Sequence, residues 1–414
     1  MQNTEHGLPM HAPMHQYPVM DGELSLGGVP LSRLAARVGQ TPFYAYDRAL
    51  LHSRVGELRS QIPPNIKLHY AMKANPMPAV VAAMAGLVDG IDVASAGELK
   101  VALDAGANPM EISFAGPGKR DAELRQAVAS RVLINVESFR ELGVLQDISA
   151  ELGAAARVAI RVNPDFELKG SGMKMGGGPK QFGVDAEQIP RMLQEVGRAG
   201  LSFEGFHLFA GSQNLRAEAI CEAQQKSFEL ALRLAQHAPA PVRFLNLGGG
   251  FGIPYFPGEQ RLDLGPVAEN LARLNERAQG ELPAASLVIE LGRYLVGEAG
   301  VYVARVLDRK ISRGQVFLVT DGGLHHHLSA SGNFGQVIRK NYPVTVGNKV
   351  DTTDREVASV VGPLCTPLDL LADRMNLPIA QVGDLVVVFQ SGAYGASASP
   401  QNFLGHPPCV EVLV

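Results

Sequence analysis

The sequence predicts an α/β fold in which eight strands alternate with helices, followed by an all-β region. Three observations predict it: short apolar runs recur from Thr41 onward, segments of helical period lie between them, and helical patterns nearly stop after about Gly297. Eight strand–helix repeats point to a (β/α)8 barrel, whose usual size is roughly 250 residues. A doubly wound open sheet would have the same local pattern, so periodicity alone leaves the closure of the sheet open.

The predicted strands are short apolar or alternating runs that end at turn residues. In the first region they are Lys67–Met72, Gly90–Ala94, Glu111–Ala115, Val132–Val136, Arg157–Val162, Phe203–Phe209, Arg243–Leu247 and Leu287–Glu290. The predicted helices between them include Met77–Leu87, Ala96–Ala105, Ala122–Ala129, Phe139–Leu152, Glu218–Gln236 and Val267–Gln279. The later predicted strands are Val301–Leu307, Val316–Thr320, Val357–Val361 and Leu385–Phe389.

Length, composition and charge limit the class of protein. A chain of 414 residues suits two domains, or one large barrel with an extension. A net charge of −4 gives no reason to expect nucleic acid or an anionic membrane as a partner. No run of about 18 apolar residues exists, and Met1–Met20 lacks a signal-peptide pattern. Three widely spaced cysteines argue against a disulfide framework, so we expect a cytoplasmic protein.

Lys73 lies in the stretch His69-Tyr70-Ala71-Met72-Lys73-Ala74-Asn75-Pro76, directly after a predicted strand. Pro76 cannot donate to a strand ladder and disfavours helix at Asn75, so the strand must end near here. Lys73 is therefore expected at the carboxyl end of a strand, where α/β sheets and barrels place their chemistry. Taken alone, it would be read as a surface lysine beside a turn.

The segment Tyr70-Ala71-Met72-Lys73-Ala74-Asn75 resembles the Schiff-base segment of the pyridoxal-phosphate decarboxylases of the alanine-racemase-like fold (fold type III). That group contains diaminopimelate, ornithine and arginine decarboxylases. The resemblance implies a closed barrel over residues 41–296, a β domain over 297–414, and an N-terminal arm over 1–40 that partly joins the β domain. It also implies that Lys73 forms an imine with pyridoxal 5'-phosphate. Because an aldehyde reacts with the neutral amine, we expect the site to favour uncharged Lys73, most simply by desolvation.

Three further motifs resemble parts of the family's phosphate site. Leu247-Gly248-Gly249-Gly250-Phe251-Gly252 follows a predicted strand, so its backbone N–H groups are free to face a phosphate, and glycine permits close approach. Such a turn alone is mostly just a loop, but here it resembles the family's phosphate-binding triple glycine. Ser212 resembles the phosphate-contacting serine, and Tyr394 the C-terminal tyrosine that touches the phosphate.

The segment Ile289-Glu290-Leu291-Gly292-Arg293 resembles the family's Glu-Pro-Gly-Arg motif, with Leu291 in place of the usual proline. The resemblance implies that Glu290 faces the pyridine nitrogen and Arg293 the phosphate. A carboxylate beside that nitrogen keeps it protonated and makes the ring a strong electron sink. Without the resemblance, the two would be an ordinary surface pair. Other residues that the resemblance places at the cofactor are Asp92, Glu98 and Arg161; from its position alone, Glu98 is a first-turn acid near a Ser95 cap.

Gly205-Phe206-His207-Leu208-Phe209-Ala210-Gly211-Ser212 departs from the family pattern. Relatives commonly have a histidine stacking on the cofactor ring at the place of Phe209. A phenyl ring can stack, but it can neither donate a hydrogen bond nor carry charge. His207 lies two residues earlier on the same strand face. It is either a substitute for that histidine or a packed neighbour.

The segment Val361-Gly362-Pro363-Leu364-Cys365-Thr366 resembles the decarboxylase cysteine motif. In the family this cysteine reaches the neighbouring subunit's site and protonates the α-carbon, which implies a homodimer with shared active sites. In isolation Cys365 would be a small buried hydrophobe. Relatives usually have an acidic residue next, which reads the substrate's distal amino group. Because Thr366 is neutral, a diaminopimelate- or ornithine-like ammonium would lack its paired carboxylate.

Two stretches remain open. The segment from Lys169 to Gly183 is either a connector or a lid at the mouth of the site. His325-His326-His327 has no partner spacing that specifies a metal, so we expect none. Because relatives bind the substrate's carboxylates after the equivalent Asp-Gly segment, His327 or Asn333 is a candidate substrate-binding residue.

The sequence thus predicts a homodimeric, pyridoxal-phosphate-dependent amino-acid α-decarboxylase with Lys73 and Cys365 as its catalytic residues. It resembles diaminopimelate decarboxylase most, particularly the exosortase-associated subgroup, whose relatives include enzymes acting on carrier-protein-tethered amino acids. A racemase of the same fold would need a second base and a weaker electron sink than Glu290. A non-catalytic cofactor-binding protein would lack the β domain, or would have lost the lysine or the cysteine.

Overall fold

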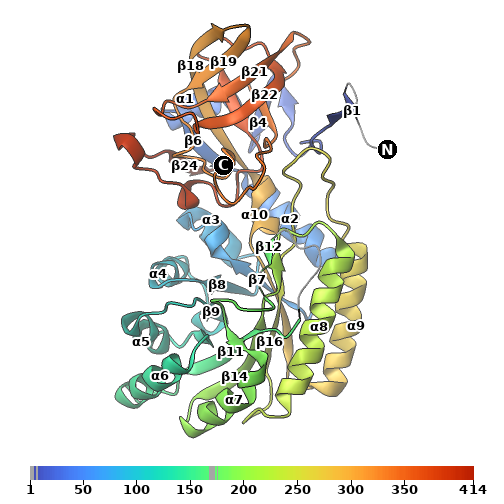
Figure 1. Cartoon of the computed structure of the whole chain (residues 1–414), viewed down its shortest axis with the longest axis vertical. Helices are drawn as coiled ribbons and strands as arrows, with labels where there is room; N and C mark the ends of the chain where they lie inside the picture. Colours follow the sequence, from blue (N-terminus) through green and yellow to red (C-terminus); the bar gives the residue numbers. More distant parts are fainter. Residues whose placement is uncertain (1–3, 6–7, 167–172, 175) are drawn as a thin grey trace. The chain divides into compact units, whose positions relative to one another are not determined.

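The computed structural model describes residues 4–5, 8–166, 173–174 and 176–414. The chain divides into two compact units (Figure 1). We call Arg54–Gly252 with Leu262–Tyr294 the barrel unit. The β unit comprises Met1–Ser53, Ile253–Arg261 and Leu295–Val414.

The barrel unit is built on parallel strands that close into a ring. They are β7 (Lys67–Ala71), β8 (Gly90–Val93), β9 (Ile112–Phe114), β10 (Leu133–Val136), β11 (Arg157–Asn163), β14 (Ser202–Leu208), β16 (Phe244–Gly249) and β17 (Ser286–Leu291). All neighbouring pairs are parallel, and the ring closes because β17 pairs with β7 and β10 pairs with β11. The predicted (β/α)8 barrel is confirmed, and the open sheet is excluded.

Helices alternate with the strands along the chain and surround them (Figure 1). They are α2 (Arg48–Gln61), α3 (Pro78–Ala85), α4 (Ala96–Asp104), α5 (Asp121–Ala129), α6 (Phe139–Leu152), α7 (Ile189–Arg198), α8 (Ala217–Ala235) and α9 (Gly265–Glu281). Ser95 and Ser138 start α4 and α6, because their side chains accept hydrogen bonds from the backbone N–H groups three residues on. The short strand β13 (Val184–Asp185) adds to β11, and β12 (Met173–Lys174) pairs with β15 (Gly211–Ser212).

Most buried strand side chains of the barrel are apolar, but a group of polar ones is buried as well. They include His69, Asp92, Asn135, Arg161, His207, Asn246 and Glu290. Buried polar groups cost free energy unless they are hydrogen-bonded or paired. Their concentration in one barrel therefore indicates a functional site rather than a purely structural core.

The β unit is strand-rich, as predicted for the C-terminal region. Its main sheet contains β18 (Gly300–Ser312), β19 (Gln315–Thr320), β20 (Val344–Val346), β21 (Arg355–Val361), β22 (Leu370–Pro378) and β23 (Leu385–Val388), joined by β6 (Phe43–Tyr46) and β24 (Val410–Leu413). Smaller elements are β1 (Thr4–Glu5), β2 (Leu8–Pro9), β3 (Val19–Met20), β4 (Glu23–Leu26), β5 (Val29–Pro30), α1 (Leu31–Val38) and, at the boundary between the units, α10 (Arg293–Val296).

The core of the β unit joins both ends of the chain to the main sheet. Leu31 and Phe43 from the N-terminal part pack with Val303 and Val387 in one buried cluster. Among the residues that the structure describes, no helix is long and apolar enough to cross a lipid bilayer.

The candidate active site

Lys73 lies at the carboxyl end of β7, as predicted. The strand ends at Ala71 and continues as a 3-10 turn over Met72–Ala74 that carries the lysine. Lys73 Nζ is 3.6 Å from Glu290 Oε1 and 5.5 Å from the centre of the Phe209 ring. The Lys73 side chain is 45% exposed and faces the Glu290 carboxylate, and the neutral amine expected from the sequence stays a prediction.

Glu290 is buried between three partners. Its first oxygen faces Lys73, while His207 Nε2 lies 3.0 Å from the second oxygen and Asn246 Nδ2 donates to it at 3.4 Å. Strand register brings them together, since His207 is level with Asn246 on the adjacent strand. Burial alone would raise the pKa of Glu290, but the charges of Lys73, His207 and Arg161 hold it well below its usual range. The carboxylate is therefore ionised, as a partner of a protonated pyridine nitrogen must be.

His207 and Phe209 have different surroundings. His207 is buried and contacts Glu290, whereas Phe209 is half-buried beside the Lys73 amine. Of the two alternatives for His207, the geometry is that of a packed neighbour with a specific partner.

The glycine-rich turn at the end of β16 packs too closely for any side chain. A Cβ atom on Gly249 would lie 1.9 Å from the Glu290 backbone oxygen, and one on Gly250 would lie 2.1 Å from the Gly211 oxygen. Gly248 and Gly250 also have positive φ angles of 73° and 76°. The turn therefore lies against the segment that carries Ser212, which brings these two predicted phosphate-binding elements together.

Asp92 and Glu98 have structural partners of their own. Asp92 Oδ1 is 3.0 Å from His69 Nδ1, and both residues are buried. Glu98 Oε2 accepts a hydrogen bond from the Ala94 N–H at 2.6 Å, and its own N–H is capped by Ser95. Burial raises the pKa of Glu98, opposed by that hydrogen bond and by the charge of Lys73. Glu98 is thus a first-turn acid of α4 that also lies within the field of Lys73.

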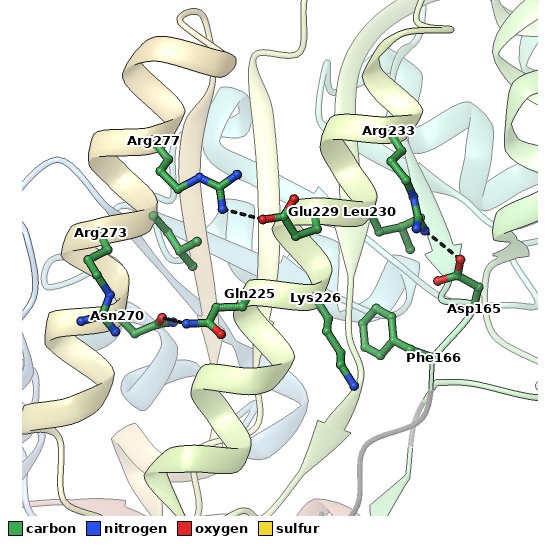
Figure 2. A pocket seen from close by; sticks show the side chains of 11 residues that line it. Asp165, Phe166, Gln225, Lys226, Glu229, Leu230, Arg233, Asn270, Arg273 and Arg277 are labelled. Carbon is green, nitrogen blue, oxygen red and sulfur yellow. Dashed lines mark hydrogen bonds and ion pairs between the residues drawn. The ribbon is translucent and has the colours of Figure 1, made fainter.

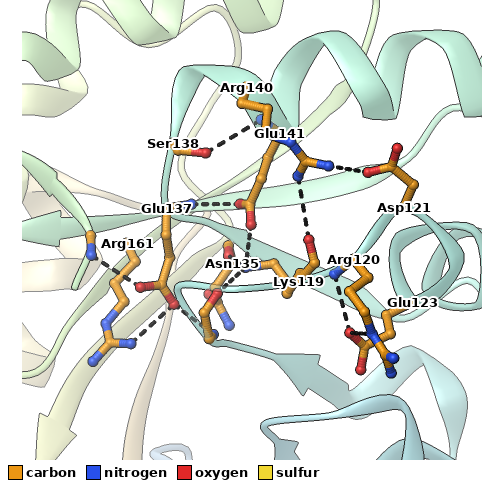
Figure 3. A network of polar contacts seen from close by, with 12 residues as sticks. Lys119, Arg120, Asp121, Glu123, Asn135, Glu137, Ser138, Arg140, Glu141 and Arg161 are labelled. Atoms are coloured by element: carbon orange, nitrogen blue, oxygen red, sulfur yellow. Dashed lines mark hydrogen bonds and ion pairs between the residues drawn. The ribbon is translucent and has the colours of Figure 1, made fainter. Parts of the chain in front are cut away.

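Arg161 belongs to a buried polar network at the ends of β10 and β11 (Figure 3). Its Nη1 is 3.0 Å from Glu137 Oε1. Behind them, Lys119 Nζ is 3.0 Å from Glu141 Oε1, and Lys119 also donates to two backbone oxygens. The family resemblance predicts Arg161 but not Glu137, since a single acid after a strand carries no local signal.

The remaining predicted residues lie in the β unit, apart from Arg293, which begins α10. Cys365 is exposed in the turn after β21, and Thr366 follows it half-buried. Asn333 Nδ2 donates to the Leu368 oxygen at 3.3 Å, which brings Asn333 beside the cysteine segment.

Tyr394 has a positive φ angle of 53°, and its carbonyl accepts a hydrogen bond from the Ser329 hydroxyl.

His327 differs from its expected role in substrate binding. Its side chain is 0% exposed, Nε2 is 2.9 Å from Ser391 Oγ, and its ring packs against Tyr44 and Tyr302. Burial lowers the pKa of His327 to about 3. His327 is therefore a core histidine of the β unit. Of the two candidate substrate-binding residues, only Asn333 is exposed to solvent.

Residues 169–172 and 175 of the segment 169–183, which we predicted as a connector or lid, lie outside the described residues. Its described end is held on the barrel, because Asn163 Nδ2 donates to the Gly178 oxygen at 2.9 Å and Gly183 N–H donates to Glu137. In the described part of the chain, His325–His327 and the other His, Cys, Asp and Glu residues form no group of three or more able to hold a metal ion.

A hollow of about 650 Å³ is lined mainly by residues of α8 and α9 and includes none of the predicted site residues (Figure 2). Two ion pairs lie in it: Arg277 Nη1 is 2.5 Å from Glu229 Oε1, and Arg233 Nη2 is 2.7 Å from Asp165 Oδ2.

The barrel site defines a class of enzyme. A lysine amine at a strand end, a buried ionised carboxylate facing it, and a side-chain-free glycine turn beside a serine are the groups that pyridoxal phosphate requires. These residues therefore fit the cofactor.

Comparison with known proteins agrees with this class. Residues 48–297 match the model of the pyridoxal-dependent decarboxylase family, pyridoxal binding domain. The chain is 39% identical to L-glutamyl-[BtrI acyl-carrier protein] decarboxylase of Niallia circulans, with 90% of this chain and 89% of the relative covered. It is 34% identical to diaminopimelate decarboxylase of Aquifex aeolicus, with 95% and 91% covered.

A solved structure gives the same result. The diaminopimelate decarboxylase of Helicobacter pylori complexed with L-lysine matches with a TM-score of 0.80 and 28% identity, over 92% of this chain and 94% of that one. The chain belongs to the pyridoxal-dependent decarboxylase family. It is a pyridoxal-phosphate-dependent amino-acid decarboxylase similar to the diaminopimelate decarboxylases.

Proposed function

We propose that this decarboxylase acts on an amino acid without a free distal ammonium group, and that its substrate is glutamate tethered to a carrier protein. The observation that carries the proposal is Asp369, the one carboxylate in the segment 362–369. It is 3% exposed, and its two oxygens accept hydrogen bonds from Leu324 N–H at 2.6 Å and Leu364 N–H at 2.8 Å. With Thr366 neutral, this segment has no carboxylate free to pair with an ammonium group.

The tether is consistent with the chemistry of the reaction. An α-decarboxylase needs a free α-carboxylate, so a carrier must be joined through the side-chain carboxyl of glutamate. The distal end of the substrate is then an uncharged acyl linkage, which requires no carboxylate from the enzyme. The 39% identity to a decarboxylase named for this kind of substrate supports the proposal, as does the resemblance to the exosortase-associated subgroup.

The proposed roles of the residues follow from their positions. Bound pyridoxal phosphate supplies the electron sink that accepts the electron pair left by CO2. Lys73 holds the cofactor covalently, ionised Glu290 stabilises positive charge on the ring nitrogen, and Phe209 covers a ring face. The phosphate is held by the glycine turn and by Ser212, Arg293 and Tyr394.

We place the proton donor on a second copy of the chain. Cys365 lies on the surface of the β unit, so its thiol is accessible to another molecule. In a homodimer with shared active sites, Cys365 of one subunit gives its proton to the substrate α-carbon in the other.

Diaminopimelate is the second candidate substrate. Its support is the 34% identity to the Aquifex aeolicus enzyme over nearly the whole chain, together with the C-terminal segment Glu411–Val414, which resembles that of diaminopimelate decarboxylases.

Thr366→Glu distinguishes the two candidates. We expect the wild-type chain to prefer glutamyl carrier protein, and the variant to gain about tenfold or more in kcat/KM for meso-diaminopimelate because it supplies the missing charge partner. Thr366→Gln, of the same size without charge, is the matched control. If wild type releases CO2 from diaminopimelate as efficiently as from the tethered substrate, the proposal is wrong.

A further inference from the structure

Glu137 is a buried acid that follows β10 and that the proposed reaction does not use. Its side chain is 1% exposed, and its carboxylate contacts three separate segments (Figure 3). Oε1 accepts from Arg161 Nη1 at 3.0 Å and from Gly116 N–H at 2.6 Å, while Oε2 accepts from Gly183 N–H at 3.0 Å. One carboxylate thus joins the loop after β9, a charged side chain on β11, and the end of the segment that precedes β13.

The position of Glu137 is also fixed through its backbone. Its backbone N–H donates to Glu141 Oε2 at 2.8 Å, and Glu141 is itself paired with the buried Lys119. Burial alone would raise the pKa of Glu137, but the charges of Arg161 and Lys119 and the Gly183 hydrogen bond lower it. The side chain is therefore a fixed, ionised acceptor.

Arg161 is held on its other side by the neighbour of Gly183. The Phe182 ring centre lies 4.8 Å from the Arg161 guanidinium carbon, within the range of a cation–π contact. Gly183 has a φ angle of 71°, and a Cβ atom there would lie 2.8 Å from the Arg161 backbone oxygen. The chain therefore passes directly over β11, and the two-residue segment 182–183 contacts Arg161 and its partner Glu137 together.

Arg161 in turn acts on Glu290, the carboxylate that we propose faces the cofactor. Its positive charge is among those that lower the pKa of Glu290. Since the interaction of two charges depends on their separation, a displaced guanidinium would change the field at Glu290.

We propose that Glu137 is a positioning residue that holds Arg161 and the segment 182–183 together as one unit. The conformation of this segment then sets the electrostatic field at Glu290 and at the bound cofactor. The inference rests on the proposed function, in which Lys73 holds the cofactor and Glu290 faces its ring nitrogen.

The test compares Glu137→Gln with Glu204→Gln in cofactor-loaded, full-length protein. Both substitutions remove a charge and keep the size. Glu204 pairs at 3.5 Å with Arg157, the first residue of β11, which is also the strand that carries Arg161. Loss of the Glu204 charge therefore weakens the barrel at the start of β11, away from the segment 182–183. Three quantities are measured: the cofactor dissociation constant, the pH titration of the bound cofactor's absorption, and tryptic cleavage after Lys180.

For Glu137→Gln we expect cofactor affinity to fall about tenfold, the absorption titration to shift, and cleavage after Lys180 to speed up about tenfold or more. Glu204→Gln should change none of the three. If Glu137→Gln lowers Tm as Glu204→Gln does but leaves the titration and the cleavage unchanged, Glu137 is purely structural and the proposal is overturned.

Phe182→Ala keeps the test valid should Glu137→Gln fail to fold, because Phe182 is half-buried at the barrel rim. It should shift the absorption titration in the same direction, and an unchanged titration would overturn the proposal.

The wild-type protein distinguishes failure of this inference from failure of the proposed function. Failure of wild type to bind the cofactor covalently contradicts the site itself, whereas normal wild type beside unaffected variants contradicts only the role of Glu137.

Discussion

Glu290 divides its two carboxylate oxygens between different tasks. One faces the Lys73 amine, and the other is held by His207 and Asn246. A buried charge is tolerated only when its partners stay in place, and removal of one partner typically costs about 3–5 kcal/mol. The contact with Glu290 explains a histidine at position 207 without ring stacking, and our proposal assigns the cofactor face to Phe209.

His327 gives a prediction at the residue scale, because burial lowers its pKa from 6.5 to about 3. Between these values the unfolded chain binds a proton that the folded chain does not, so stability falls as the pH falls through this window. The expected slope is about 1.4 kcal/mol per pH unit. His327→Gln should reduce the pH slope of the unfolding free energy, measured by urea titration from pH 7 to pH 4, by that amount.

The exposed His52 on α2 provides the matched control, since His52→Gln removes a histidine without touching the core. An unchanged slope in His327→Gln would contradict the account of His327 as a neutral core residue.

Single residues also show how far the sequence could predict the site. Lys73 and Glu290 were predicted as cofactor residues, and parallel register brings their strands together through the pairing of Glu290 with His69. The role proposed for His327 was not supported, because its burial depends on Tyr44 and Tyr302, which come from two distant parts of the chain. No local pattern carries that information.

At the scale of elements, the predicted barrel strands agree with the structure because alternating apolar runs ending in turns have few competing interpretations. Helix α7 was not among the predicted helices, and Pro190 and Gly197 within it weaken the helical pattern. The pairing of β6 with β24 joins residues 43–46 to 410–413, and such long-range pairing has no local signal.

Two glycines give opposite predictions for the same substitution. Gly249→Ala should destabilise the fold by at least about 3 kcal/mol, because its Cβ would lie 1.9 Å from the backbone oxygen of Glu290. Gly143 lies on the exposed side of α6 with no other atom within 4 Å of an added Cβ. Gly143→Ala should therefore stabilise by about 1 kcal/mol. Urea midpoints measure both effects, and a stable Gly249→Ala protein would contradict the tight packing of the turn.

At the scale of the whole molecule, the proposed division of labour places Lys73 in the barrel unit and Cys365 in the β unit of a second copy. Lys73→Ala and Cys365→Ala should each be nearly inactive alone. If sites are shared in a homodimer, refolding an equal mixture should restore about a quarter of wild-type activity, because half of the dimers are mixed and each has one complete site. A mixture as inactive as its components would mean that each chain supplies its own proton donor.

The central claim is tested most directly by CO2 release from purified, cofactor-loaded protein. The substrates are glutamate loaded on an acyl carrier protein, free glutamate, meso-diaminopimelate, lysine, ornithine and arginine, with Lys73→Ala as the inactive control. We predict release from the tethered glutamate, none from Lys73→Ala, and little from the amino acids with a distal ammonium. Efficient release from diaminopimelate with none from the tethered substrate would contradict the proposed substrate. Release by Lys73→Ala would contradict the site itself.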